Sequence, residues 1–247
     1  MAPASSPPER AVLLTRPLED SRAFAERLAE DGIATEIWPL TRIVPVMTEL
    51  RLPPTVDGVI ATSAHGLRAL AALTGRRDLP VLAVGARTAA VARGLGFGLV
   101  LEAGGDAGAL ADLARRAGLR HLVYPRGRDV SRDLAAEIGP GGPRLTEAVL
   151  YAAEETGPPP APVAHALASG RIAAITVWSA RNAGILARHF RRDPPPAGPP
   201  AFVAISEAAG KPLDVAGFGG IVHAAAPTSG EMRAAIGAVL ARGGGTR

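Results

Sequence analysis

The sequence of 247 residues contains no cysteine. This absence excludes disulfide bonds, thiolate metal sites and cysteine nucleophiles, and it is consistent with a reducing cytoplasm. The chain also lacks a run of about 18 apolar residues, the length that a membrane-spanning helix needs. Residues 1–10, MAPASSPPER, do not combine a basic start with an apolar stretch, as a secretion signal would. These features predict a soluble cytoplasmic protein with a short disordered leader and no membrane partner.

Lysine and aromatic residues are also scarce. Lys211 is the only lysine among 27 basic residues, and aromatic side chains make up 4% of the chain. The formal net charge is +4 and the isoelectric point is about 10.5. Arginine binds carboxylates and phosphates through a planar fork, although a solvated arginine-rich surface explains any single arginine more simply. The few aromatic residues give no obvious stacking platform, so we expect no nucleic-acid partner.

Motifs for metals, nucleotides and catalytic triads are missing. The five histidines are dispersed and show no HExxH or similar spacing of metal ligands. There is no P-loop and no GxSxG elbow, and the glycines of GLGFG follow a helical pattern rather than a strand. We therefore expect no metal site and no cofactor.

Apolar runs of strand length alternate with amphipathic helical patterns along most of the chain. This alternation is typical of an α/β fold, in which crossover helices connect parallel strands. The runs number about ten, more than one open sheet holds comfortably, so the pattern favours two domains of about five strands each. Helices are expected, among other places, at 21–32, 64–73, 86–94, 181–190 and 229–241.

One phrase occurs twice: an apolar run, a small hydroxyl residue, a polar turn and the start of a helix. The two copies are DGVIATSAHGLRAL at 57–70 and AAITVWSARNAGIL at 173–186, and their serines, Ser63 and Ser179, are 116 positions apart. The segments AVGARTAAVARGLGF and AISEAAGKPLDVAGF resemble each other at a similar spacing of 121 positions. Two spacings this close indicate a duplicated unit.

The second copy is followed by too few strands to complete a sheet, so it must take strands from the N-terminal part of the chain. We therefore expect a discontinuous domain of residues 1–38 and 153–247, with residues 43–149 inserted as the other domain. The chain would cross between them twice, through PLTRIVPV and through EAVLYAAE.

Small, hydroxylated or arginine residues follow most of the expected strands. In open parallel sheets, ligands bind beyond the carboxyl ends of the strands, beside helix N-termini with unpaired N–H groups. Serine and threonine are also ordinary helix caps, so each residue alone has a structural explanation, but two facing sets of such strand ends suit a large anion. The candidate binding residues are Arg16, Thr62, Ser63, Ala64, Gly85, Thr88, Arg126, Gly127, Ser179, Arg181, Thr228 and Ser229.

Seven motifs follow one another along nearly the whole chain: LLTRP, IATSAHGLRAL, VGARTAAVARGLGF, YPRGRD, EAVLYAAE, VWSARNAGIL and APTSG. In order and spacing they resemble the uroporphyrinogen-III synthase family. The resemblance implies two flavodoxin-like parallel-sheet domains joined by a two-stranded linker. It also implies a lyase of heme and porphyrin biosynthesis that cyclises the linear tetrapyrrole hydroxymethylbilane to uroporphyrinogen III, with inversion of ring D, loss of water and no cofactor.

The resemblance also suggests roles for single residues. Tyr151 matches the family tyrosine favoured as the acid that helps the ring A hydroxyl to leave, and packing within the linker is the alternative explanation of this residue. Thr62 and Thr228 match positions suspected of substrate contact, which helix capping explains equally well. The implied partner is the small-molecule substrate, and nothing argues for more than a monomer. A non-catalytic, bilobed tetrapyrrole-binding or regulatory protein is the main alternative, and a nucleotide-dependent enzyme without its phosphate loop is a third.

Overall fold

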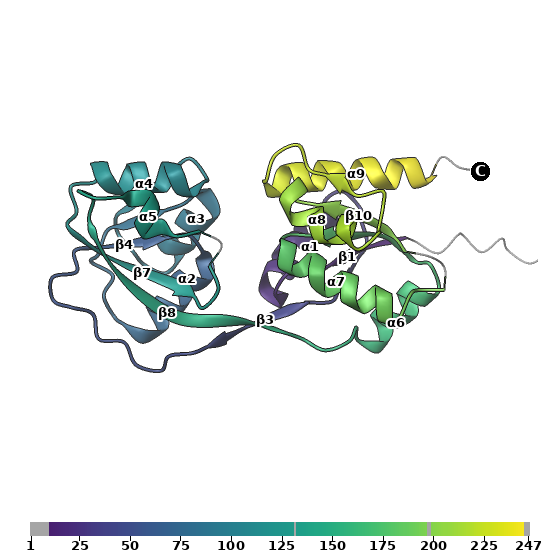
Figure 1. The fold of residues 1–247 in the computed structure, drawn as a ribbon, viewed down its shortest axis with the longest axis horizontal. Coiled ribbons are helices and arrows are strands. Elements are labelled where there is room, and N and C mark those ends of the chain that lie inside the picture. The colour runs from purple at the N-terminus through teal and green to yellow at the C-terminus, as the bar shows by residue number, and fades with distance from the viewer. Residues whose placement is uncertain (1–9, 131, 197–198, 245–247) are drawn as a thin grey trace, which may run out of the picture. The chain divides into compact units, whose positions relative to one another are not determined.

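The computed structural model describes residues 10–130, 132–196 and 199–244 (Figure 1). It divides into two compact units: unit 1 contains the described residues of Met1–Arg42 and Glu155–Arg247, and unit 2 those of Ile43–Glu154. The leader expected at residues 1–10 lies outside the described residues except for Arg10. Within these described ranges, no helix is long and apolar enough to cross a membrane.

Unit 1 contains five parallel strands in the order β11-β10-β9-β1-β2. The strands are β1 (Ala11–Leu14), β2 (Thr35–Ile37), β9 (Ile172–Val177), β10 (Ala201–Ala204) and β11 (Val222–His223). The helices are α1 (Leu18–Ala29), α6 (Ala161–Ala168), α7 (Ala180–Arg192), α8 (Glu207–Val215) and α9 (Ser229–Gly244). Numbered along the chain, the strand order is 2-1-3-4-5, the order of flavodoxin.

Helices cover both faces of this sheet (Figure 1). Val163 of α6, Leu186 of α7 and Leu213 of α8 pack on one face. Phe24 of α1 and Met232 of α9 pack on the other. Because both faces are covered, the central strands are nearly continuous apolar runs, such as AVLL in β1 and IAAITV in β9.

Unit 2 contains a sheet of six strands in the order β3-β8-β7-β4-β5-β6. The strands are β3 (Thr41–Pro45), β4 (Gly58–Ala61), β5 (Val81–Ala83), β6 (Val100–Glu102), β7 (His121–Gly127) and β8 (Arg144–Glu155). The helices are α2 (Ala64–Leu73), α3 (Ala86–Gly94), α4 (Ala107–Arg116) and α5 (Leu134–Ile138). Leu67 of α2 and Ala92 of α3 belong to the apolar cluster on one face, while Leu110 of α4 and Leu134 of α5 belong to the cluster on the other.

The strands β3 and β8 run in opposite directions. The amide of Val46 donates to the carbonyl of Leu150 (3.0 Å), and the amide of Thr156 donates to the carbonyl of Leu40 (3.0 Å), so residue numbers rise on one side and fall on the other. The sequence predicts about five strands here, and β3 is the additional one because the crossing segment TRIVP satisfies its backbone N–H and C=O groups by pairing with β8. The chain passes between the units at 42–43 and at 154–155, on these neighbouring strands.

The parallel strands of unit 2 have the same spatial arrangement as those of unit 1, but the chain enters the arrangement at a different strand. Numbered along the chain from β4 to β8, their order in the sheet is 5-4-1-2-3. Thus β4, β5 and β6 correspond to β9, β10 and β11, while β7 and β8 correspond to β1 and β2. The winding direction reverses between β1 and β9 in unit 1 and between β7 and β4 in unit 2, and we call these places the switch points. Open α/β sheets bind ligands beyond the carboxyl ends of the strands at such points.

The predicted α/β class is confirmed, and two helices have the predicted bounds, 64–73 for α2 and 86–94 for α3. In contrast, α1 begins at Leu18, directly after Pro17, rather than at Ser21. The hydroxyl of Ser21 donates to the carbonyl of Arg16 (2.8 Å) inside the first turn instead of capping the helix. A serine that binds the backbone in this way does not mark the helix start.

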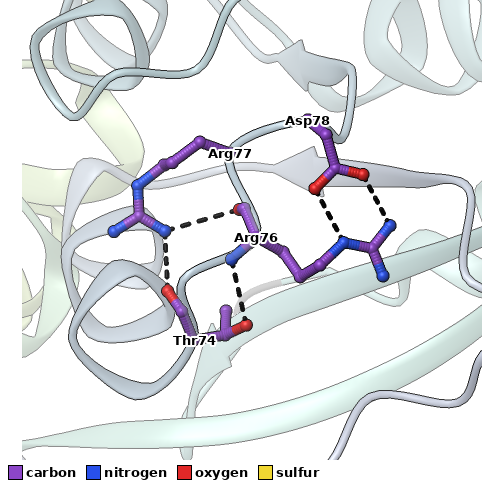
Figure 2. A network of polar contacts seen from close by, with 4 residues as sticks. All are labelled: Thr74, Arg76, Arg77 and Asp78. Atoms are coloured by element: carbon purple, nitrogen blue, oxygen red, sulfur yellow. Dashed lines mark hydrogen bonds and ion pairs between the residues drawn. The ribbon is translucent and has the colours of Figure 1, made fainter.

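The loop between α2 and β5 uses its two arginines to support the fold (Figure 2). Arg76 forms a fork with Asp78, with Nε–Oδ1 and Nη2–Oδ2 distances of 2.7 Å and 2.8 Å. Nη1 of Arg77 donates to the carbonyl of Thr74 (2.7 Å). Nη2 of Arg77 donates to the carbonyl of Ala71 (2.8 Å). These carbonyls lie at the end of α2, where intrahelical donors run out. Part of the arginine surplus is therefore structural.

Candidate active site

A cavity of about 370 Å³ lies in unit 2 at the carboxyl ends of its strands. Thr62 follows β4, Arg126 and Gly127 end β7, and Tyr151 lies on β8. The cavity therefore occupies the switch point between β4 and β7 and brings together four of the predicted site residues. The other lining residues are Val84, Gly105, Asp106, Ala107, Tyr124, Asp129, Val130, Arg132 and Leu134.

Tyr151 lies against the backbone of the neighbouring strand. Gly127 pairs in register with Tyr151, and a Cβ atom on Gly127 would lie 3.0 Å from Cε2 and 3.4 Å from Oη of the tyrosine. A glycine is therefore needed to seat the ring here. The ring of His65, from the first turn of α2, has its centroid 6.0 Å from that of Tyr151. Tyr151 packs partly against an apolar cluster and also lines the cavity.

Thr62 and Tyr124 form a hydroxyl pair in the wall of the cavity. The distance between Thr62 Oγ1 and Tyr124 Oη is 3.0 Å, and either oxygen can be the donor. Tyr124 is 4% exposed, whereas Thr62 is half-buried. Sequence reasoning missed Tyr124 as a site residue, because its strand HLVYP reads as buried core. The available signal was its place three residues before Gly127, at the carboxyl end of the strand.

Arg126 is held in the wall by several bonds. Its Nε donates to Glu147 Oε2 (2.8 Å), and its Nη1 donates to the carbonyls of Gly127 (2.9 Å) and Arg128 (3.2 Å). The side chain is 18% exposed. These bonds fix the guanidinium in place and partly neutralise its charge, so Arg126 presents an oriented cation rather than a mobile one.

Two helices begin close to this strand end and differ in how they are capped. The hydroxyl of Ser63 accepts a bond from the backbone N–H of His65 (3.1 Å) and caps α2, whose first residue, Ala64, is buried. Gly85 occupies the cap position of α3 and has no side chain to accept such a bond. Thr88, in the first turn of α3, is buried. Capping therefore explains Ser63, while Gly85 leaves the first N–H groups of α3 without a side-chain cap.

Three of the predicted residues in unit 1 lie at helix starts. The hydroxyl of Ser179 accepts a bond from the backbone N–H of Asn182 (3.2 Å) and caps α7. Thr228 Oγ1 accepts a bond from the N–H of Glu231 (3.2 Å), and Ser229 is the first residue of α9. These contacts match the capping explanation.

The two predicted arginines of unit 1 have different environments. Arg16, directly after β1, pairs with Asp20 (Nη2–Oδ2 2.8 Å), and its guanidinium carbon lies 4.5 Å from the centroid of the Trp178 ring. Arg181 is exposed in the first turn of α7. The position of Arg16 corresponds to the end of β7 in unit 2, because β1 and β7 are equivalent strands.

A larger cavity, of about 610 Å³, lies in unit 1. It is lined by Arg10, Ala173, Ala201 and Val222, at or next to the amino ends of their strands, and by Val239 of α9, among others. This is the end of the sheet opposite the one where open α/β sheets bind ligands. None of the predicted site residues lines it, so its size alone does not make it the active site.

The fold and the pocket define a class of protein: a chain of two doubly wound α/β units with hydroxyl and guanidinium donors at the carboxyl ends of the strands. Within the described residues, no group of three or more metal-ligating side chains is present. A family model described as Uroporphyrinogen-III synthase HemD matches residues 22–234. The chain belongs to this family of cyclising lyases of tetrapyrrole biosynthesis, and the resemblance in its motifs is confirmed.

A solved structure agrees with this assignment at the level of the fold. The uroporphyrinogen-III synthetase of Helicobacter pylori 26695 is similar, with a TM-score of 0.64 and 14% identity, covering 94% of this chain and 99% of that one. A mutant uroporphyrinogen III synthase of the extremely thermophilic bacterium Thermus thermophilus has a TM-score of 0.48 and 19% identity, with the same coverage. No curated protein matches the chain by sequence.

Proposed function

We propose that this chain cyclises hydroxymethylbilane to uroporphyrinogen III, inverting ring D and releasing water, and that the cavity at the β4/β7 switch point receives part of the substrate. Membership of the family carries the reaction. The observation that supports the location is the convergence of Thr62, Arg126, Gly127 and Tyr151 on one cavity. The larger cavity in unit 1, by contrast, is lined by none of the expected residues.

The chemistry of the wall suits carboxylates, of which the substrate carries eight. The Thr62 hydroxyl and the Arg126 guanidinium are hydrogen-bond donors in this wall. The start of α3, which has no side-chain cap, lies outside the lining but follows directly after Val84, which belongs to it. Each helix terminus contributes about 0.3 to 1 kcal/mol toward a nearby carboxylate. Several weak contacts of this kind would bind the substrate without any single indispensable side chain. Ser63, Ala64 and Thr88 would act mainly by placing these helix starts.

We assign Tyr151 as the acid. Its phenol would donate a proton to the ring A hydroxyl, the C–O bond would break, and water would leave. Ring D would then attack the ring A methylene carbon through the α-carbon that already carries its bridge to ring C, which gives a spiro intermediate. The bond between that α-carbon and the bridge would break, and the bridge carbon would bond to the unsubstituted α-carbon of ring D, which inverts the ring. The proton that this second α-carbon loses would restore the phenol. A free phenol has a pKa of about 10, so near neutrality it is a hydrogen-bond donor and a reluctant acid. Orientation of the folded substrate would supply much of the rate.

We propose further carboxylate contacts at the carboxyl ends of the unit 1 strands, made by Arg16, Ser179, Arg181, Thr228 and Ser229. Their positions directly after strands or at helix starts, and the exposed charge of Arg181, support this assignment. We further propose that the protein acts as a monomer in the cytoplasm, without a nucleic-acid partner.

The test supplies purified protein with freshly generated hydroxymethylbilane, oxidises the products and separates the porphyrin isomers by chromatography. The proposal predicts type III in excess over the type I isomer that forms spontaneously. Tyr151→Phe should lower the rate at least about tenfold, equivalent to 1.4 kcal/mol, without unfolding the chain. His165→Gln, on the exposed side of α6, is the matched control. Type I alone from folded protein would instead favour a non-catalytic tetrapyrrole binder, and unchanged turnover in Tyr151→Phe would remove that residue from the mechanism.

A further inference from the structure

The chain has two tyrosines, and both line the cavity at the β4/β7 switch point. One is Tyr151; the other, Tyr124, has no role in the mechanism described above. We propose that Tyr124 is a positioning residue, whose buried phenol holds the Thr62 hydroxyl in the orientation that donates to a substrate carboxylate. This inference rests on the proposed function, because it needs a carboxylate ligand in the cavity.

The position of Tyr124 is fixed by packing. Its ring belongs to an apolar cluster that includes Leu82, Leu122 and Leu134. It lies on β7, which pairs in parallel with β4, the strand that Thr62 follows. A ring 96% buried among aliphatic side chains has little freedom to turn, so its hydroxyl is a fixed point in the wall. A flexible surface group would not orient a neighbour in this way.

The chemistry of the hydroxyl pair determines which oxygen donates once an anion is bound. A carboxylate only accepts hydrogen bonds, so Thr62 must give its single proton to it. The Thr62 oxygen can then only accept from Tyr124, and the phenol becomes the donor across the distance of 3.0 Å. Bonds in such a chain polarise and strengthen one another. Tyr124 would therefore act through Thr62 without touching the substrate.

The alternative is that Thr62 merely satisfies a buried phenol, as any acceptor would. The two explanations differ in how removal of the Tyr124 hydroxyl should change the affinity for the ligand. Tyr124→Phe keeps the ring and its packing but leaves the Thr62 hydroxyl free to rotate. A positioning role predicts weaker binding of the carboxylate, whereas a purely structural role predicts a loss of stability with unchanged affinity.

The experiment measures KM and kcat for hydroxymethylbilane, together with Kd for uroporphyrin III, the oxidised octacarboxylate, in wild type, Tyr124→Phe, Thr62→Val and the double variant. We expect Tyr124→Phe to raise KM and Kd about fivefold, the range of one hydrogen bond, with kcat nearly unchanged. When Thr62→Val is already present, adding Tyr124→Phe should not raise KM or Kd further. When Thr62→Ser is present instead, a hydroxyl remains at position 62, and Tyr124→Phe should again raise KM and Kd.

Thr146→Val is the matched control, because it also removes a hydroxyl that is bonded to a buried ring. The Thr146 hydroxyl lies 2.7 Å from Nε2 of His121, and His121 is at the start of β7, whereas Tyr124 is nearer its end. This variant should cost stability and leave KM and Kd unchanged. Equal changes in Tyr124→Phe and Thr146→Val, additive effects in the double variant, or an unchanged KM and Kd in Tyr124→Phe would each overturn the assignment.

A second measurement tests the same proposal without the Tyr124→Phe variant, in case that variant fails to fold. Because the chain has two tyrosines, ¹³Cζ-tyrosine labelling of the folded protein gives two signals, assigned with Tyr151→Phe. Anaerobic uroporphyrinogen III should shift the Tyr124 signal in wild type and shift it much less in Thr62→Val, and equal shifts in both would contradict the relay. Failure of the proposed function is distinguishable: wild type would then produce type I alone, while the Kd values still report on Tyr124.

Discussion

The two switch points are filled in different ways. In unit 1, Arg16 after β1 lies over the ring of Trp178 after β9, at 4.5 Å, and pairs with the buried Asp20. In unit 2, the equivalent strands β7 and β4 bring Tyr124 and Thr62 together as a hydroxyl pair beside a cavity. The same strand order therefore brings together either an arginine with a ring and a carboxylate, or two hydroxyls beside a cavity, depending on which side chains follow the strands.

The two copies of the repeated helix start also differ in the side chains that they carry. Gly66 and Asn182 each stand three residues after the capping serine of their copy. Asn182 has room for a side chain, which is buried and accepts a bond from Ser179 Oγ (2.8 Å). A Cβ atom on Gly66 would lie 2.2 Å from the carbonyl oxygen of Pro125, a backbone atom of β7. In unit 2 the helix thus approaches the strand more closely than any side chain permits.

The largest expected effect breaks this close approach. Gly66→Ala should destabilise unit 2 by about 3 kcal/mol or more, because helix and strand must move apart. Hydrogen exchange followed separately in the two units should show the loss in α2 and β7. Gly184→Ala is the control, because the nearest atom to its added Cβ is a flexible Arg188 nitrogen at 3.7 Å. That change should be neutral or stabilising, as for alanine in a helix. Equal protection of unit 2 in Gly66→Ala and wild type would refute the packing argument.

The next effect concerns the opposite end of the repeat. Asp57 accepts bonds from the backbone N–H groups of Arg120 and His121, both at 2.9 Å, and so fastens β4 to β7; unit 1 has Ala173 at this position. Burial is the largest single influence and opposes ionisation, but the bonds from backbone N–H groups and the neighbouring His121 together outweigh it and hold the pKa of Asp57 below its usual 3.8. Its contribution is therefore complete above about pH 3.8 and is lost as the pH falls through the folded pKa.

Asp57→Ala should accordingly cost about 2 kcal/mol at neutral pH, the value of bonds to a charged group. Denaturant unfolding at a series of pH values would measure this difference, which should shrink in acid. Ala173→Asp, which adds the carboxylate to unit 1, tests whether the strand pair can use it there. A difference between Asp57→Ala and wild type that persists below the folded pKa would show that the carboxylate charge is not its source.

A smaller effect, seen in activity, is expected at the pocket itself. Gly127→Ala places a methyl group 3.0 Å from the Tyr151 ring, so the ring must shift away from the position proposed for catalysis. The rate of type III formation should fall about tenfold, equivalent to 1.4 kcal/mol, while the fold persists. Gly98→Ala is the control, because its Cβ would meet nothing within 4 Å. Full activity in Gly127→Ala would show that the reaction does not depend on the position of the Tyr151 ring that Gly127 allows.

The two capping serines should respond alike, since capping is the feature that both copies share. Ser63→Ala and Ser179→Ala should each cost about 1 kcal/mol, whereas the glycine variants at these positions should cost only a few tenths. Thermal unfolding with exchange measured in α2 and α7 would check both. A much larger cost at Ser179 would indicate that its added bond to the Asn182 side chain contributes more than the cap.

Local signals made the elements predictable, while contacts across the sheet were not. Ser63 and Gly85 stand just before α2 and α3, which is why their starts could be read from the sequence. The pairing of Thr62 with Tyr124 joins residues 62 positions apart, and no local pattern encodes that register. Arg16 was predicted as an anion contact from its place after a strand, but its pairing with Asp20 depends on where α1 begins.

The last and smallest effect is a change in pH dependence within unit 1. His189 of α7 is 9% exposed, and its ring centroid lies 4.8 Å from that of Trp38. Burial lowers its pKa from the usual 6.5, and the charge of Arg192 lowers it further against the opposing effect of Asp193.

The unfolded chain therefore binds a proton at His189 at a higher pH than the folded chain does. The free energy of unfolding should decline as the pH falls below about 6.5 and level off below the folded pKa. His189→Phe keeps an aromatic ring beside Trp38 and should flatten this decline, measured by exchange in α7 between about pH 7.5 and 5. A slope in His189→Phe as steep as in wild type would assign the decline to other groups, because a phenylalanine cannot take up the proton that the unfolded histidine binds.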